Sequence, residues 1–278
     1  MRFLSAYLLC ILLSAPALFA QATAAPAAPV APSAPASAPA KPQDPTIPAI
    51  KYERDGTTPN ASFMKNHEKF VEQAKKGGID VLFLGDSITA GWAGNGKDVW
   101  KERYDKMNAA NFGIGGDRTQ HVLWRIENGE LDGAIKPKVI VLMIGTNNVG
   151  ADDADKIAEG VTKIVKTAQA KTSAKVLLLG VFPRGITEKQ AQESNDPKKI
   201  AAAKNTPMQR EKITRINEII SKLDDGKTVR YLDIKDKFLS PEGTLSPEIM
   251  PDYLHLTKPG YVLWADAIDP LLKEMMGT

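Results

Sequence analysis

Five short runs of apolar residues constrain the fold of this chain more than any other feature. Each run is nearly continuous rather than alternating with polar residues, which is typical of strands buried on both faces of a sheet. Strand-like runs that alternate with helical periodicity predict βαβ units, and therefore one three-layer α/β/α domain around a parallel sheet. The runs span Val81 to Leu84, Ala109 to Phe112, Val139 to Ile144, Val176 to Val181 and Val229 to Leu232. Helical periodicity is found at residues 61–77, 119–129, 153–170, 208–224 and 259–275.

The first 24 residues have the pattern of a secretory signal peptide. Met1 and Arg2 precede an apolar run from Phe3 to Leu13, and Ala-x-Ala cleavage candidates follow at residues 20–22 and 22–24. A transmembrane anchor is the alternative, but this run is well short of the ~20 residues that span a bilayer. We therefore expect cleavage near residue 24, no stable membrane insertion, and a secreted or periplasmic protein.

Residues 25–52 consist mostly of Ala and Pro. Such a segment offers few backbone donors for a sheet and little apolar bulk for a core. It is therefore predicted to be an extended, semi-rigid linker. The folded domain is expected to occupy residues 53–278.

Composition excludes several classes of function. Lys and Arg number 36 against 33 Asp and Glu, for a net charge of +3, and no segment interleaves basic with aromatic residues as a nucleic-acid-binding surface does. The sole cysteine, Cys10, lies inside the expected signal peptide, so the mature chain can form no thiolate nucleophile or thiolate metal site. The three histidines lack the spacing of metal ligands. We expect no nucleic-acid partner, no metal and no cofactor.

Three of the predicted strands end in segments that contain candidate functional residues. These segments are Gly85-Asp86-Ser87, Gly113-Ile114-Gly115-Gly116 and Gly145-Thr146-Asn147-Asn148. In an open parallel sheet, ligands bind beyond the carboxyl ends of the strands. The three ends therefore predict one shared crevice.

Ser87 is the candidate nucleophile of this crevice. A serine hydroxyl needs a base within hydrogen-bond reach, usually a histidine that a carboxylate holds in one tautomer. Asp252 and His255 lie three residues apart near the C-terminus and can supply that pair. Taken alone, Asp86 and Ser87 could simply cap a helix, and Asp252 with His255 could form a structural contact at a helix entrance.

Acyl transfer also needs N–H donors for the developing oxyanion. Gly115-Gly116 follows a predicted strand, and its lack of Cβ atoms lets a backbone N–H face the crevice. The side-chain amide of Asn147 and the backbone N–H of Ser87 are further candidates. Separately, a Gly-Gly pair and an Asn after a strand are common turn residues.

Together these segments resemble a known family. Gly85-Asp86-Ser87, Asn111 to Asp117, Gly145 to Asn148 and Asp252 to Leu256 occur in the order and context of the four blocks of the SGNH, or GDSL, esterase and lipase superfamily. The sequence is most similar to the catalytic subunits of the intracellular platelet-activating factor acetylhydrolases, over Asn111 to Asn148 and at Phe182-Pro183-Arg184-Gly185. The resemblance covers roughly residues 60–275.

The resemblance implies a flavodoxin-like, five-stranded parallel sheet of order 2-1-3-4-5. It implies a catalytic triad of Ser87, His255 and Asp252, with oxyanion donors at Ser87, Gly116 and Asn147. The implied activity is that of a metal-independent serine esterase acting on short acyl esters, chiefly acetyl, through an acyl-enzyme. The resembling subunits form dimers, which makes a homodimer possible here.

Two questions stay open at this stage. In a secreted protein, the substrate could be an acylated polysaccharide or other carbohydrate, or an acylated small molecule such as a phospholipid. The alternative to an enzyme is a non-catalytic module on an esterase fold that binds a glycan or a protein.

Some residues are interpreted without a catalytic role. The polar stretch 187–206 looks longer than the family's loop and is expected to be a surface insertion or part of the substrate rim. Asp117 and Arg118 are expected to form a solvated ion pair, and His67 to lie exposed on a helix. Trp92, Trp100, Trp124 and Trp264 are expected to pack in the core or at the rim, and Trp92, just after Ser87, is the best exception as a platform for a sugar.

Overall fold

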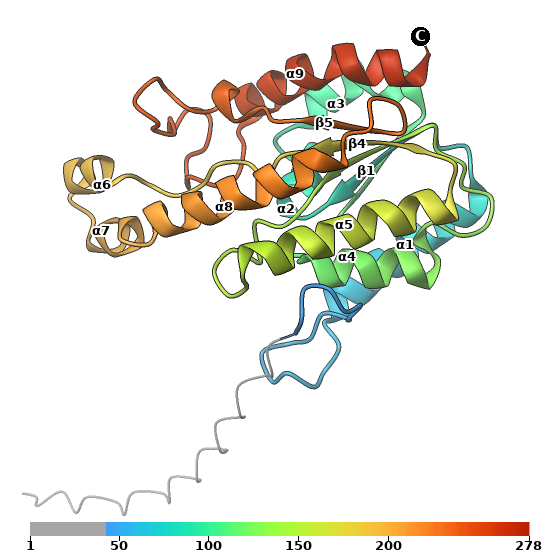
Figure 1. The fold of residues 1–278 in the computed structure, drawn as a ribbon, viewed down its shortest axis with the longest axis horizontal. Coiled ribbons are helices and arrows are strands. Elements are labelled where there is room, and N and C mark those ends of the chain that lie inside the picture. Colours follow the sequence, from blue (N-terminus) through green and yellow to red (C-terminus); the bar gives the residue numbers. More distant parts are fainter. Residues whose placement is uncertain (1–42, 278) are drawn as a thin grey trace, which may run out of the picture. The chain divides into compact units, whose positions relative to one another are not determined.

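The computed structural model describes residues 43–277 of the chain (Figure 1). The expected signal peptide and residues 25–42 of the expected linker lie outside them. The strands are β1 (Val81–Gly85), β2 (Ala109–Gly113), β3 (Val139–Met143), β4 (Lys175–Leu179) and β5 (Val229–Leu232). The helices are α1 (Ala61–Lys76), α2 (Ser87–Ala90), α3 (Lys97–Arg103), α4 (Thr119–Arg125), α5 (Ala154–Lys171), α6 (Glu188–Ser194), α7 (Pro197–Ala203), α8 (Thr206–Ile220) and α9 (Lys258–Met276).

The five strands form one parallel sheet of order β2-β1-β3-β4-β5, which confirms the predicted fold class and strand order. The order reverses direction at β1, because the chain moves from β1 to β2 on one side and then returns to β3 on the other. Ligands bind at such a switch point, beyond the carboxyl ends of the strands. The ends of β1, β2 and β3, which carry the candidate segments, therefore meet at one edge of the sheet.

Helices cover both faces of the sheet, as Figure 1 shows. Alternate residues of β1 point to opposite faces of the sheet. Leu82 and Leu84 belong to the hydrophobic core formed with α1, α4, α5 and α8, whereas Val81 and Phe83 belong to the core formed with α3 and α9. A strand buried on both faces has no polar side, because successive side chains point to opposite faces. This accounts for the continuous apolar runs in the sequence.

The stretch 187–206 is not the loop that the sequence predicts, because it contains the two short helices α6 and α7. Thr187 caps α6 in a capping box with Gln190, and Asp196 caps α7 ahead of Pro197. Each helix is only 7 residues long, so neither completes enough turns to give an apolar periodicity that a sequence pattern could reveal.

The compact domain begins before residue 53, inside the segment that the sequence assigns to the linker. Thr46 is buried, the hydroxyl of Thr119 donates to the Pro45 carbonyl at 2.8 Å, and Ala49 N donates to the Gln120 carbonyl at 3.1 Å. These contacts use backbone groups and isolated side chains, which leave no periodic signal in the sequence. We refer to residues 43–60 as the N-terminal segment.

Within residues 43–277, no helix is long and apolar enough to cross a membrane. The same part of the chain contains no cluster of His, Cys, Asp and Glu side chains that could hold a metal ion.

Candidate active site

Ser87 lies at the carboxyl end of β1, as the first residue of α2. Asp86 precedes it as the N-cap, and its carboxylate oxygen Oδ1 accepts a hydrogen bond from Ile88 N at 2.9 Å. The turn from strand to helix is tight: a Cβ on Gly85 would lie 2.3 Å from both the Met143 carbonyl oxygen and the Thr89 hydroxyl. Glycine is therefore required there, and the turn exposes the Ser87 side chain at the edge of the sheet.

Ser87, His255 and Asp252 are connected by two hydrogen bonds. Ser87 Oγ lies 2.9 Å from His255 Nε2, and His255 Nδ1 lies 2.6 Å from Asp252 Oδ2. The other carboxylate oxygen of Asp252 accepts from the backbone N–H groups of Leu254 at 3.1 Å and His255 at 2.7 Å. These backbone bonds form a tight turn, which places side chains three residues apart on the same side of the chain.

The protonation state of this chain of hydrogen bonds follows from Asp252. Partial burial opposes its ionisation, but the hydrogen bonds from the side chain and backbone of His255 prevail and lower the pKa of Asp252. An ionised carboxylate only accepts, so His255 Nδ1 must carry the proton that it donates. Nε2 is then left as an acceptor for the Ser87 hydroxyl.

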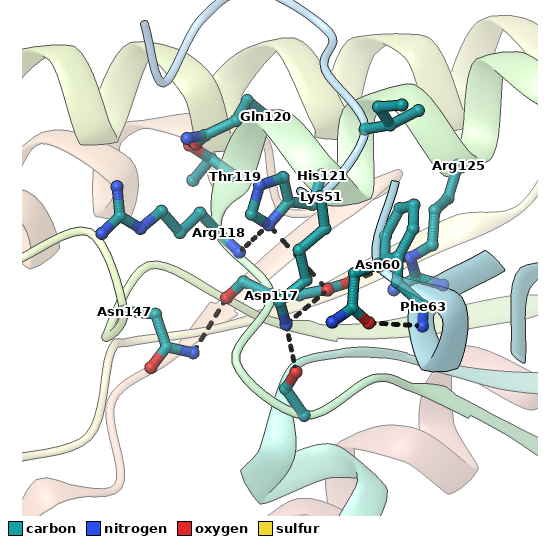
Figure 2. Close-up of polar contacts among 12 residues, drawn as sticks. Lys51, Asn60, Phe63, Asp117, Arg118, Thr119, Gln120, His121, Arg125 and Asn147 are labelled. Carbon is teal, nitrogen blue, oxygen red and sulfur yellow. Dashed lines mark hydrogen bonds and ion pairs between the residues drawn. The ribbon is translucent and has the colours of Figure 1, made fainter. Parts of the chain in front are cut away.

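The glycine-rich loop after β2 lies beside Ser87. A Cβ on Gly115 would be 4.0 Å from the Ser87 Cβ, and Gly116 has a positive φ of 72°. Among the described residues, no acceptor is bonded to the backbone N–H of Ser87 or of Gly116. Asn147 also reaches this loop, since its side-chain amide donates one hydrogen to the Asp117 carbonyl at 2.9 Å (Figure 2). The amide's second hydrogen remains available.

The loop after β3 is fixed by contacts that the sequence did not reveal. Arg184 Nη1 donates to the Thr146 carbonyl at 2.9 Å and to its hydroxyl at 3.2 Å. Asn148 is fully buried and accepts from Thr119 N at 3.0 Å. These contacts join the loop that carries Asn147 to α4 and to the segment after β4.

Asp117 does not form the expected solvated pair with Arg118. It is fully buried, and its carboxylate accepts from Nε of the fully buried Arg125 at 2.9 Å. Burial raises the pKa of Asp117 to about 6, although Arg125 opposes the shift. The sequence could not distinguish the two arginines, because Arg125 lies one helix length away and only the fold brings it back.

Arg125 also connects Asp117 to a second buried acid. Its Nη1 bonds Glu130, whose other oxygen lies 2.9 Å from Nδ1 of His67. His67 is buried, so its predicted exposure is wrong; α1 turns this side chain inward against the π-helical residues 126–130 that follow α4. The network ends at β1, the strand that precedes Ser87, because Arg125 Nη2 donates to the Gly85 carbonyl at 3.3 Å.

Trp92 does not line the site. It is fully buried and packs against Phe83, Tyr261 and Trp264. It therefore belongs to the core between the sheet and α9.

Helix α7 contributes to the surroundings of the site. Arg184, Lys198, Lys199 and Thr206 line a pocket of about 430 Å³ together with Asp252, Tyr253 and Leu254. Lys199 lies 5.9 Å above the Tyr253 ring, within the range of a cation–π contact. The stretch 187–206 thus contributes side chains to a pocket that Asp252 also lines.

The sequence and the fold are both similar to those of known lipases and acylhydrolases. The profile of the GDSL-like lipase/acylhydrolase family matches residues 83–263. Platelet-activating factor acetylhydrolase IB subunit alpha1 from Bos taurus is 37% identical over 216 residues, which cover 77% of this chain and 84% of the relative. The corresponding alpha2 subunit from Rattus norvegicus is 34% identical over 230 residues, covering 82% and 91%. A GDSL-like lipase from Bacteroides thetaiotaomicron has the same fold, with a TM-score of 0.58 at 20% identity over 77% of this chain and 98% of that structure.

Proposed function

The chain belongs to the GDSL-like lipase/acylhydrolase family, whose members act on esters, and we propose that it is a serine esterase with Ser87 as the nucleophile, His255 as the base and Asp252 as the orienting acid. The observation that carries this proposal is the pair of hydrogen bonds from Ser87 Oγ to His255 Nε2 and from His255 Nδ1 to Asp252 Oδ2. A binding module needs neither a base nor a nucleophile, so this arrangement favours an enzyme.

The reaction follows from these contacts in two halves. His255 Nε2 accepts the Ser87 proton as Oγ attacks the ester carbonyl, and then returns it to the alcohol that leaves. Water next gives a proton to His255 and attacks the acyl-enzyme, which releases the carboxylic acid and restores the Ser87 hydroxyl. Asp252 stabilises the imidazolium that forms in each half.

We assign the oxyanion site to the backbone N–H groups of Ser87 and Gly116 and the side-chain amide of Asn147. Support comes from the two N–H groups that have no acceptor among the described residues and from the remaining hydrogen of the Asn147 amide. Donors fixed in advance of the reaction stabilise the charge that develops on the carbonyl oxygen, and loss of one typically costs roughly 10²- to 10³-fold in kcat.

The acyl group is proposed to be short, chiefly acetyl. The two relatives reported above, at 37% and 34% identity, are named acetylhydrolases, which supports this choice. The alcohol is proposed to belong to a carbohydrate or a phospholipid. The side chains of His255 and Asp252 are 43% and 54% exposed, so the alcohol side of the site is open to a bulky group. The signal-peptide pattern of residues 1–24 supports a secreted or periplasmic enzyme.

Hydrolysis of p-nitrophenyl esters from acetate to octanoate tests the proposal. We expect kcat/KM to fall steeply with chain length, and Ser87→Ala to abolish activity. Ser221→Ala, which removes a hydroxyl that only bonds the Glu218 carbonyl, serves as the matched control and should be as active as the wild type. Activity that survives Ser87→Ala would refute the assignment, and a folded but inactive wild type would favour the binding module.

Acetate release from two natural classes of ester would then identify the alcohol. An acetylated polysaccharide and an sn-2 acetyl phospholipid are suitable probes. The probe with the higher kcat/KM identifies the alcohol as a carbohydrate or a phospholipid, provided that Ser87→Ala abolishes its hydrolysis.

A further inference from the structure

Lys51 reaches the glycine-rich loop from outside the part of the chain that the family profile matches. Its side chain is 22% exposed, and its ammonium donates to the Gly115 carbonyl at 2.5 Å. The same ammonium lies 3.8 Å from Oδ1 of the buried Asp117. Figure 2 shows the Lys51 side chain extending from the N-terminal segment to Asp117.

The backbone of Lys51 is fixed by contacts on both sides. Its carbonyl accepts from Asn60 N at 2.8 Å, and Asn60 caps α1 by accepting from Phe63 N. Two residues earlier, Ala49 N donates to the Gln120 carbonyl at 3.1 Å. The side chain therefore approaches the loop from a defined position and loses less conformational freedom than a lysine on a mobile segment would.

The Gly115 carbonyl and the Gly116 N–H belong to the same peptide unit. That unit is planar and trans, so its oxygen and hydrogen point in opposite directions. A group that fixes the oxygen consequently fixes the direction of the N–H. Both flanking residues are glycines, and Gly116 has a φ of 72°, so the local chain itself restricts this peptide very little.

The positive charge of Lys51 also favours the Gly116 N–H as a hydrogen-bond donor. A hydrogen bond from a cation is stronger than one from a neutral donor, and it polarises the peptide so that the opposite N–H becomes a better donor. Glycine at position 116 leaves room for the ammonium, because a Cβ there would lie 2.9 Å from Lys51 Nζ.

We propose that Lys51 is a positioning residue for the oxyanion site: it holds and polarises the Gly115–Gly116 peptide so that the Gly116 N–H faces the reacting carbonyl oxygen. The inference rests on the proposed function, because it concerns a donor of that reaction. It does not require Lys51 to touch the substrate.

Three variants of the full chain test this inference. Lys51→Met removes the ammonium and keeps the apolar part of the side chain, and Lys51→Arg keeps the charge. Lys163→Met is the matched control, because Lys163 of α5 also bonds the N-terminal segment, through Nζ to the Thr46 carbonyl at 3.1 Å. The measurements are kcat and KM for p-nitrophenyl acetate, the inhibition constant of a boronic acid that forms a tetrahedral adduct on serine, and the melting temperature.

We expect Lys51→Met to lower kcat roughly 10- to 100-fold, less than the outright loss of an oxyanion donor, with KM within about threefold of wild type. The inhibition constant of the boronic acid should rise by a similar factor. Lys51→Arg should recover most of kcat, and Lys163→Met should match the wild type. If Lys51→Met fails to fold, Lys51→Gln is judged by the same criteria.

Wild-type kcat in a folded Lys51→Met protein, beside an inactive Ser87→Ala, would overturn this inference and leave the proposed function intact. An equal loss of kcat in Lys163→Met would also overturn it, because the effect would then come from loosening the N-terminal segment. A wild-type protein that neither hydrolyses the ester nor binds the boronic acid would overturn both proposals.

Discussion

Adjacent residues of the candidate site have opposite environments. Ser87 is partly exposed, whereas the Asp86 carboxyl is fully buried and its Oδ2 has no hydrogen-bond partner among the described residues. Burial, opposed by the hydrogen bond from Ile88 N, raises the pKa of Asp86 to about 7. The ionised form of such a group is unfavourable in the interior, so the folded state becomes less stable relative to the unfolded chain as pH rises above the ordinary pKa of an aspartate.

This environment predicts a pH-dependent effect of Asp86→Asn. Between pH 4 and pH 7 the unfolded chain releases a proton that folded Asp86 retains, so the wild type loses stability as pH rises through this window. Asparagine does not titrate. The free energy of unfolding of Asp86→Asn relative to wild type should therefore increase from pH 4 to pH 7, by about 1.4 kcal/mol for each step of one in pH, and then level off. Urea denaturation at several pH values measures the difference, and a difference that is constant from pH 4 to pH 8 would contradict the account.

Asp252→Asn tests the role of the orienting carboxylate. Without the charge, neither the tautomer nor the imidazolium of His255 is stabilised, and we expect kcat for p-nitrophenyl acetate to fall roughly 10²- to 10⁴-fold with little change in KM. Asp98→Asn, which removes an exposed partner of Lys258, is the matched control and should keep full activity. An Asp252→Asn enzyme as fast as this control would exclude the proposed role.

At the scale of elements, the sequence predicted those parts of the fold whose burial is periodic. All five strands and α1, α5, α8 and α9 lie where the apolar runs and helical periodicities place them, within a few residues at their ends. The strand ends at β1, β2 and β3 also supplied the residues that gather at the site. Elements of one or two turns, such as α2 and α7, bury too few side chains to show a period.

Contacts between elements were less accessible to sequence reasoning. Nothing in the sequence pattern distinguishes His67 and Arg125 from ordinary polar residues of helices. Both reach Glu130 because α1 packs against the end of α4. Lys51 likewise lies in a segment with no periodicity. Long-range polar partners depend on the assembled fold, and a single sequence does not report them.

The buried network should be costly to break. Arg125→Met removes the guanidinium that the buried carboxyl groups of Asp117 and Glu130 share, which should destabilise the protein by about 3–5 kcal/mol. Arg215→Met, which removes an exposed partner of Asp155, should cost less than about 1 kcal/mol. Urea unfolding of both variants makes the comparison, and equal midpoints would show that the network contributes nothing particular to stability.

At the scale of the whole molecule, two segments outside the predicted core reach the site. Figure 1 shows the N-terminal segment beside α4 and α1, and α6 and α7 beyond the start of α8. The first contacts the glycine-rich loop after β2 through Lys51, and α7 lines the pocket that includes Asp252. Both segments therefore lie next to residues of the candidate site.

Two truncations test whether the N-terminal segment belongs to the domain. A chain that starts at residue 43 keeps the contacts of Pro45, Thr46 and Lys51 with the body of the domain, whereas one that starts at residue 53 loses them. At about 1 kcal/mol for each hydrogen bond, the shorter chain should lose roughly 2–5 kcal/mol of unfolding free energy relative to the longer one. Identical urea midpoints would restore the boundary at residue 53 that the sequence predicts.

The central claim is that Ser87 is a nucleophile activated by His255, and covalent labelling tests it most directly. A dialkyl p-nitrophenyl phosphate should phosphorylate the protein once per chain, with loss of esterase activity in proportion, and peptide mass spectrometry should find the label on Ser87. His255→Ala should react far more slowly. Label on another residue, or full activity in the labelled protein, would contradict the account.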